Sequence, residues 1–131
     1  MPVEQITVFL ENQTGRLADV TKILSDENIN LQGFSTTEAR DYGILRLVVA
    51  DVKRAKEALR DAGFTTHIAD VVCITVEDRP GELYKILDIL AGEEINIDYV
   101  YVIADTKIII SVENIEDTEK ILLKNGIRLC N

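Results

Sequence analysis

The sequence has no tryptophan, one histidine, two prolines and two cysteines. The cysteines, Cys73 and Cys130, are far apart and form no CxxC motif. Cys73 lies in an apolar run, where a reduced cysteine acts as a small hydrophobic residue, so we expect free thiols and a reducing, cytoplasmic location. Residues 1–4 show no charged-then-apolar signal pattern. No apolar run reaches the ~18 residues that a membrane helix needs, and we expect no membrane partner.

Positive charge is scarce. The chain carries 14 Lys and Arg against 23 Asp and Glu, a formal net charge of −9. Residues 1–68 hold ten acids and eight bases (net −2), and residues 69–131 hold thirteen acids and six bases (net −7). An acidic surface repels phosphate backbones, because nucleic-acid affinity depends on Lys and Arg that displace counterions. We therefore expect no nucleic-acid partner.

An internal repeat is the most informative feature of the sequence. Residues 6–31 match residues 72–97 at an offset of 66, which places Gly15 on Gly81. Further along the offset becomes 63. The missing residues fall around 104–106, where a hairpin turn is expected, and deletions settle in exposed turns because few contacts are lost there. The chain is therefore interpreted as a duplicated compact domain.

Each copy gives the same order of predicted elements. Apolar residues alternate over residues 6–10, as in a strand with one face buried. A helix with an apolar face begins near Gly15. A hairpin of residues 31–37 and 42–50 follows, turning near Arg40 and Asp41. A second helix lies between Asp51, a good N-cap, and Gly63, and a short strand lies near residues 65–68. The second copy repeats these roles with Asn114, Gly126 and residues 127–130.

The predicted order is βαββαβ, twice. Right-handed crossovers place both helices on one face of a four-stranded antiparallel sheet. We therefore predict an α+β fold of two ferredoxin-like modules, residues 1–68 and residues 69–131. The opposite sheet face, where Tyr42, Val71, Cys73 and Ile109 are expected, is predicted to be free to pack on a partner module.

Two motifs resemble the ACT domain family. In the first copy a strand leads into Asn12–Leu17, and the following helix ends in Asn28–Leu31. In the second copy Asp78–Leu83 carries Asp-Arg-Pro-Gly, a common opening in that family, and the helix ends in Glu94–Ile97. The copies cover nearly the whole chain, as in stand-alone tandem ACT proteins. The resemblance implies a non-catalytic, amino-acid-binding regulator of metabolism, whose modules pair through their sheets. A homodimer and a metabolic enzyme are the protein partners that we expect.

The residues of these motifs suit the binding of a free amino acid. Helix starts at Gly15 and Gly81 offer backbone N–H groups for a carboxylate. Asp78 suits the ammonium group, which Asn12 can also accept through its carbonyl oxygen. The turn after each helix is expected to close over the ligand side chain. The candidate ligand-binding residues are Asn12, Gln13, Thr14, Gly15, Arg16, Leu17, Asn28, Ile29 and Asn30 in the first copy, and Asp78, Arg79, Pro80, Gly81, Glu82, Leu83, Glu94, Ile95 and Asn96 in the second.

Two alternatives stay open for these residues. The polar and glycine residues can serve the turns alone, and the asparagines can simply end the helices. The copies also differ, because Thr14, Gly33 and Ser35 correspond to Pro80, Tyr99 and Tyr101. The tyrosines either fill space near the second strand, which leaves one module to bind, or lie at an interface or on the surface of the sheet.

Residues for catalysis are missing from the pattern. His67 lies in a short strand with no recognisable serine or cysteine nucleophile motif, and no Walker loop or GxGxxG is present. We expect no enzyme activity, cofactor or metal. The same βαββαβ order also occurs in metallochaperones and RNA-recognition modules. This chain lacks the paired-cysteine loop of the former and the exposed strand aromatics of the latter. The remaining alternative is a ligand-free regulatory subunit that docks on a metabolic enzyme through its sheets.

Overall fold

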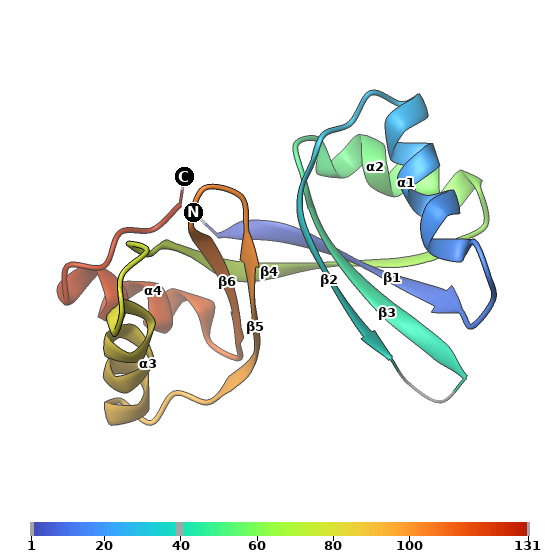
Figure 1. Ribbon diagram of the computed structural model, residues 1–131. Coiled ribbons are helices and arrows are strands. Elements are labelled where there is room, and N and C mark those ends of the chain that lie inside the picture. The colour runs from blue at the N-terminus through green and yellow to red at the C-terminus, as the bar shows by residue number, and fades with distance from the viewer. Residues whose placement is uncertain (1, 39–40, 131) are drawn as a thin grey trace. The chain divides into compact units, whose positions relative to one another are not determined.

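The computed structural model describes residues 2–38 and 41–130, and the predicted turn residue Arg40 lies outside them. The chain divides into two compact units (Figure 1). One unit comprises Glu4–Ala69. The other contains Asp70–Asn131 and the N-terminal residues up to Val3. Each unit carries one copy of the repeat, so we describe them as the first and the second module.

The first module has the predicted βαββαβ order. Its sheet has the strand order β2-β3-β1-β4, and β3 pairs antiparallel with both β1 and β2. The two helices lie together against one face of this sheet (Figure 1). The elements are β1 (Val3–Glu11), α1 (Arg16–Asp26), β2 (Leu31–Glu38), β3 (Tyr42–Val49), α2 (Val52–Asp61) and β4 (Thr65–Thr75).

The second module repeats this order, with a shorter last strand. Its sheet has the order β4-β6-β5, and β6 pairs antiparallel with both neighbours. The last strand, predicted at residues 127–130, is reduced to an isolated bridge between Leu129 and Ile74. The remaining elements are α3 (Glu82–Gly92), β5 (Ile97–Ile103), β6 (Lys107–Val112) and α4 (Ile115–Lys124).

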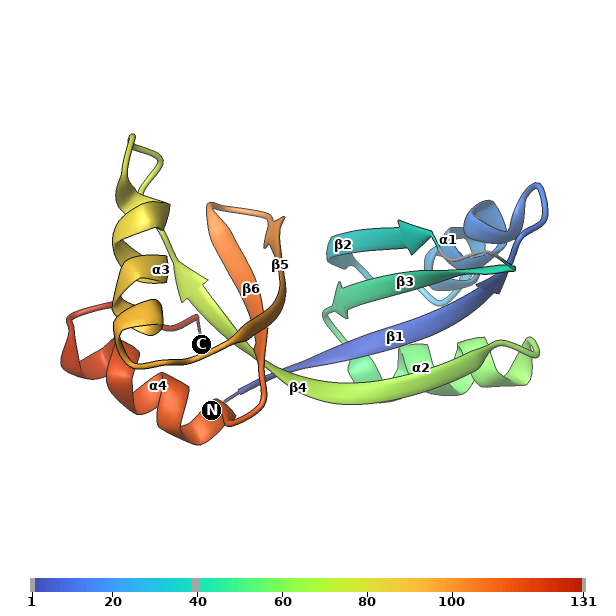
Figure 2. The same cartoon turned by 90° about the horizontal axis from the view of Figure 1, so that it is seen from below.

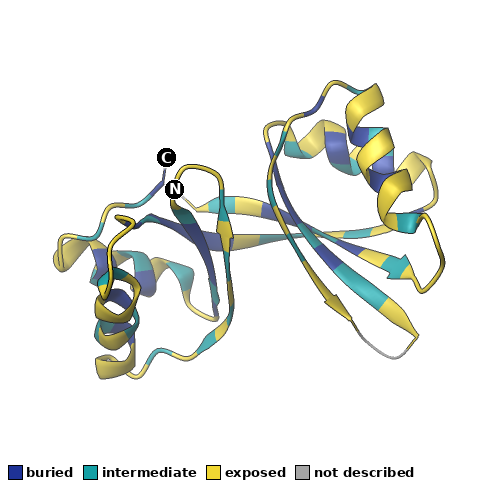
Figure 3. Cartoon of the chain, in the orientation of Figure 1, coloured by how far each residue is buried: buried dark blue, intermediate teal, exposed yellow. Residues whose placement is uncertain are grey.

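Each module has its own hydrophobic core between sheet and helices. In the first module Ile6 and Val8 of β1 pair with Leu47 and Leu45 of β3, so all four side chains point to the face that the helices cover. In the second module Val72 and Ile110 pair in the same way. The helices carry buried residues on one side and exposed residues on the other (Figure 3). The α+β fold of two βαββαβ modules is therefore confirmed.

The second helix of each module begins with the predicted side-chain cap. The Asp51 carboxylate accepts a hydrogen bond from the Arg54 backbone N–H at 3.2 Å. The Asn114 amide oxygen accepts one from the Asp117 backbone N–H at 3.0 Å. These caps satisfy backbone donors that a helix start leaves unpaired. The first helices, α1 and α3, begin differently, and this difference bears on the candidate site.

One strand serves both copies of the repeat. The sequence predicts a strand at residues 65–68 and a new strand after residue 70, but the structure has the single uninterrupted strand Thr65–Thr75 (Figure 2). Residues 65–75 contain no proline or glycine that would break the strand. The first module therefore ends, and the second begins, within β4.

The prediction of free thiols is wrong, because Cys73 and Cys130 form a disulfide. The segment after α4 returns alongside β4, where the Cys130 backbone N–H donates to the Cys73 carbonyl oxygen at 2.8 Å. This pairing brings the two Cα atoms to 5.2 Å, within the range that a disulfide spans. Because the two cysteines are paired, they give no support for a reducing compartment. Among the helices that the structure describes, none is long and apolar enough to cross a membrane.

Candidate functional site

The first helix of each module starts at a left-handed glycine. Gly15 precedes α1 with φ of 88°, and Gly81 precedes α3 with φ of 86°. Within the described part of the chain no side chain caps either helix start. The first turn of each helix therefore presents backbone N–H groups and the positive end of the helix dipole.

A cleft of about 340 Å³ lies beside the start of α3. Asp78 and Arg79 of the loop contribute polar groups to it, and Leu83 extends from the first turn of α3. Its opposite wall comes from β5 and β6. The full lining is Val76, Glu77, Asp78, Arg79, Leu83, Val102, Thr106 and Ile108. The cleft is thus an apolar wall that faces one loop of charged residues.

The charged residues of this loop are partly engaged with one another. The Arg79 guanidinium lies 2.6 Å from the Glu77 carboxylate and 3.2 Å from that of Glu82. Asp78 makes no ion pair or side-chain hydrogen bond with any residue in the described ranges. Asp78 therefore remains available to a cationic group.

A corresponding cleft of about 220 Å³ lies beside the start of α1. Four predicted residues, Asn12, Gln13, Arg16 and Leu17, line it together. The rest of the lining is Leu10, Glu11, Thr36, Thr37, Glu38, Tyr42, Gly43 and Ile44. Compared with the second module, this cleft is smaller, and Asn12 stands in place of a carboxylate.

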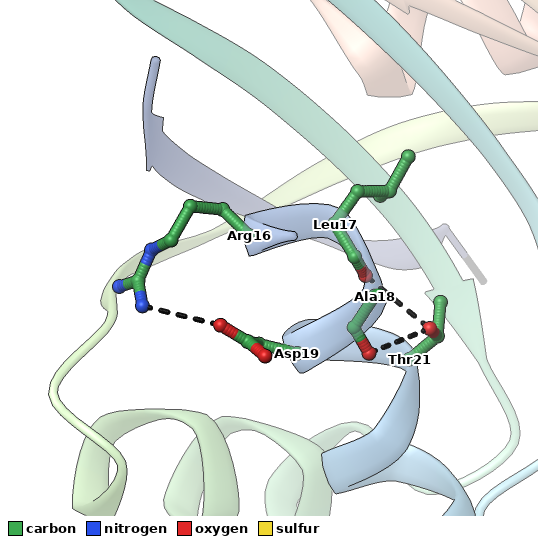
Figure 4. Close-up of polar contacts among 5 residues, drawn as sticks. All are labelled: Arg16, Leu17, Ala18, Asp19 and Thr21. Atoms are coloured by element: carbon green, nitrogen blue, oxygen red, sulfur yellow. Dashed lines mark hydrogen bonds and ion pairs between the residues drawn. The ribbon is translucent and has the colours of Figure 1, made fainter. Parts of the chain in front are cut away.

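The Arg16 side chain is partly buried by its neighbours. Its guanidinium lies over the Phe64 ring, 4.5 Å from the centroid, an attractive cation–π geometry. One terminal nitrogen of Arg16 also lies 3.4 Å from the Asp19 carboxylate (Figure 4). On the exposed surface of the same helix, Lys22 donates to Asp26 at 2.7 Å. This hydrogen bond raises the pKa of Lys22, and neither residue lines the cleft.

The structure does not bring all predicted site residues together. Asn28, Ile29 and Asn30 line a separate cleft of about 370 Å³ at the far end of α1, with Thr21, Leu24, Ser25 and Leu31. In the second module Glu94, Ile95 and Asn96 likewise follow α3, whereas Asp78–Gly81 precede it. An 11-residue helix is about 16 Å long. One small amino acid therefore cannot contact both ends of α3 within the same module.

Of the two alternatives for the tyrosines, the structure disfavours the one in which they fill the site. Tyr99 and Tyr101 stack, with ring centroids 6.3 Å apart, and alternation along β5 places them on the face opposite Val100 and Val102. Val102, not a tyrosine, lines the cleft. The tyrosines therefore do not fill this site. No sequence signal identifies Val102, because this wall forms only when β5 and β6 pair; Thr36, its equivalent through the repeat, lines the first cleft.

We expect Gly81→Ala to lower the free energy of unfolding by about 1 kcal/mol, because an L side chain is strained at positive φ. An added Cβ meets no atom within 4 Å, so the effect is purely a backbone effect. Gly92→Ala is the matched control, since Gly92 lies in the last turn of α3 in an equally open place without positive φ. Gly92→Ala should leave stability unchanged or raise it. Urea denaturation followed by circular dichroism measures both free energies of unfolding. Equal losses in the two variants would contradict the left-handed conformation of Gly81.

Comparison with known proteins identifies the family. The model of the ACT domain pair matches residues 1–131, and the chain belongs to this family. Protein BT0572 from Bacteroides thetaiotaomicron is 38% identical, with a TM-score of 0.94 over 99% of this chain and 92% of that chain. The ligand-free regulatory subunit of aspartate kinase from Thermus thermophilus shares the fold at 18% identity, with a TM-score of 0.69 over 93% of this chain and 89% of that chain. No curated protein matches.

Proposed function

We propose that the chain is a non-catalytic regulatory protein that binds a free amino acid. The observation that carries this proposal is the cleft beside α3, where an unpaired carboxylate, an uncapped helix start and an apolar wall meet. These are the three features that an amino acid needs: a partner for its ammonium group, donors for its carboxylate and a surface for its side chain.

Each group of the ligand has a candidate partner. Asp78 accepts hydrogen bonds from the ammonium group. The Glu82 N–H already donates to the Arg79 carbonyl oxygen at 3.3 Å, so the next backbone N–H groups in the first turn of α3 donate to the carboxylate, as helix starts do for other anions. The side chain then lies against Leu83, Val102 and Ile108, which favours an aliphatic or aromatic amino acid because apolar burial is favourable.

The first module is the weaker candidate. Its cleft has Asn12 in place of Asp78, so the ammonium group meets a neutral oxygen instead of a charge. Thr36 also replaces Val102 and makes the wall more polar. We therefore expect the second module to bind more tightly than the first.

Thermal unfolding in the presence of each common amino acid tests the function. A ligand at about one hundred times its dissociation constant stabilises the folded state by about 2.7 kcal/mol, which raises Tm by several degrees. We expect one amino acid or a related few to produce this shift. Asp78→Asn should remove most of it, and Asp88→Asn, an equal change of charge on the exposed surface of α3, should retain it. No shift with any amino acid would overturn the proposal.

A second candidate, the ligand-free interaction subunit, is favoured by the edge strand β5. This strand ends the sheet order, so the part of the chain that the structure describes leaves its outer backbone edge without a strand partner. Val100 and Val102 are 42% and 66% exposed on it. We propose that a second copy of the chain pairs with this edge and forms a homodimer.

The regulated enzyme is also a matter of proposal. The regulatory subunit of aspartate kinase shares this fold, and a metabolic enzyme is the partner that we expect for this chain too. A cytoplasmic location remains a prediction. Sedimentation equilibrium with and without the stabilising amino acid separates a ligand-free dimer from a ligand-dependent one.

A further inference from the structure

A second cleft, of about 330 Å³, lies between the start of α3 and the segment that follows α4. It shares loop residues with the cleft of the proposed amino-acid site, called here the Asp78 cleft. Its other walls differ, because they come from α3 and residues 125–128 instead of β5 and β6. The full lining is Thr75, Val76, Glu77, Arg79, Glu82, Lys85, Ile86, Asn125, Gly126, Ile127 and Arg128. The proposed amino-acid site does not use these outer walls.

This cleft gathers positive charge on an acidic chain. Three of its residues are basic and two are acidic, whereas the whole chain has a net charge of −9. The two acids, Glu77 and Glu82, are both engaged by Arg79. Lys85 and Arg128 make no side-chain hydrogen bond or ion pair with any described residue. The cleft therefore has one more cation than it has anions, and Lys85 and Arg128 are its cations without a bonded partner among the described residues.

The first module has a different set of contacts at the equivalent place. Through the repeat, Arg16 and Asp19 stand where the second module has Glu82 and Lys85. Arg16 pairs with Asp19 (Figure 4), and its guanidinium lies over the Phe64 ring. In the second module Glu82 binds Arg79 instead, and Ile127 replaces the ring. Lys85 thus loses the partner that its counterpart Asp19 has.

We propose that this cleft of the second module binds a small oxyanion, with Lys85 and Arg128 as its two cationic ligands. The group bound is a phosphate or a carboxylate, since both accept charge-assisted hydrogen bonds from ammonium and guanidinium groups. The volume suits a small molecule. Neither cation lines the Asp78 cleft, so substitutions at Lys85 and Arg128 probe the oxyanion site without removing a proposed amino-acid ligand.

Titrations followed by amide NMR, with inorganic phosphate, pyrophosphate and citrate at constant ionic strength, test this site. We expect saturable shifts confined to residues 75–86 and 125–128. A preference for phosphate and pyrophosphate over citrate, or the reverse, identifies the group bound. Lys85→Gln and Arg128→Gln should each weaken binding about tenfold, since each removes a hydrogen bond to a charged group.

Lys124→Gln is the charge-matched control, because Lys124 lies in the last turn of α4 and does not line the cleft. It should bind as the native chain does. The double variant Glu82→Arg with Lys85→Asp gives the second module the pair of the first and should abolish binding. The proposal is overturned if no probe gives saturable shifts below about 20 mM, an affinity too weak for a specific site. It is equally overturned if Lys124→Gln weakens binding as much as Lys85→Gln, since the effect would then be general electrostatics.

Discussion

Reduction of the Cys73–Cys130 disulfide is expected to lower the free energy of unfolding by about 4 kcal/mol. The bond joins residues 57 positions apart, and a closed loop of that size restricts the unfolded chain by this amount in the chain-entropy account. The loop contains all helices and strands of the second module after β4. For a chain of this length the loss corresponds to a fall in Tm of roughly 15 °C. Urea and thermal unfolding, each with and without a reductant, measure it.

Cys130→Ser provides the control for this experiment. The variant should match the reduced native chain in stability and should show no response to reductant, because a serine hydroxyl cannot form the disulfide and only the backbone contact between the two segments remains. A thiol assay on the unfolded, unreduced native chain should find no free thiol. Two free thiols together with an unchanged Tm would contradict the disulfide and restore the sequence-based expectation.

Leu122→Ala is expected to destabilise the chain by about 3 kcal/mol. Leu122 is fully buried in the core of the second module, and truncation there removes apolar contacts and leaves a cavity. Leu123→Ala on the same helix is the matched control. Leu123 is 58% exposed, and a substitution at such a position changes stability by about 0.5 kcal/mol or less.

The repeat supplies a second arm for this test. Leu59 occupies the position of Leu122 in the first module and is also fully buried. Leu59→Ala should therefore cost a similar amount of unfolding free energy. Urea denaturation followed by circular dichroism gives all three values. A Leu122→Ala variant as stable as Leu123→Ala would show that α4 does not pack in this core as described.

The fold was readable from the sequence because every pattern occurs twice. Alternation in β1, the apolar face of α1 and the caps at Asp51 and Asn114 are local features, and local geometry determines them. The disulfide was not readable. It depends on the register with which the last residues return to β4, and this contact joins distant segments that no periodicity links.

The candidate site was predicted only in part for the same reason. The loops at Asn12 and Asp78 follow from local turn chemistry, and both line a cleft. Val102 and Ile108 belong to the opposite wall, which forms only when β5 and β6 have paired. The sequence pattern places the turns at Asn28 and Glu94 in the same site as these loops, but the full length of α1 or α3 separates each turn from its loop.

The shared strand β4 has a consequence for the history and the handling of this protein. Duplication of a domain within a gene usually gives two domains that can be expressed, exchanged or recombined separately. Here the seam between the copies lies inside Thr65–Thr75, and a break at either side of the seam removes part of β4 from one of the copies. The repeat is therefore visible in the sequence as two units, but it can be inherited and engineered only as one.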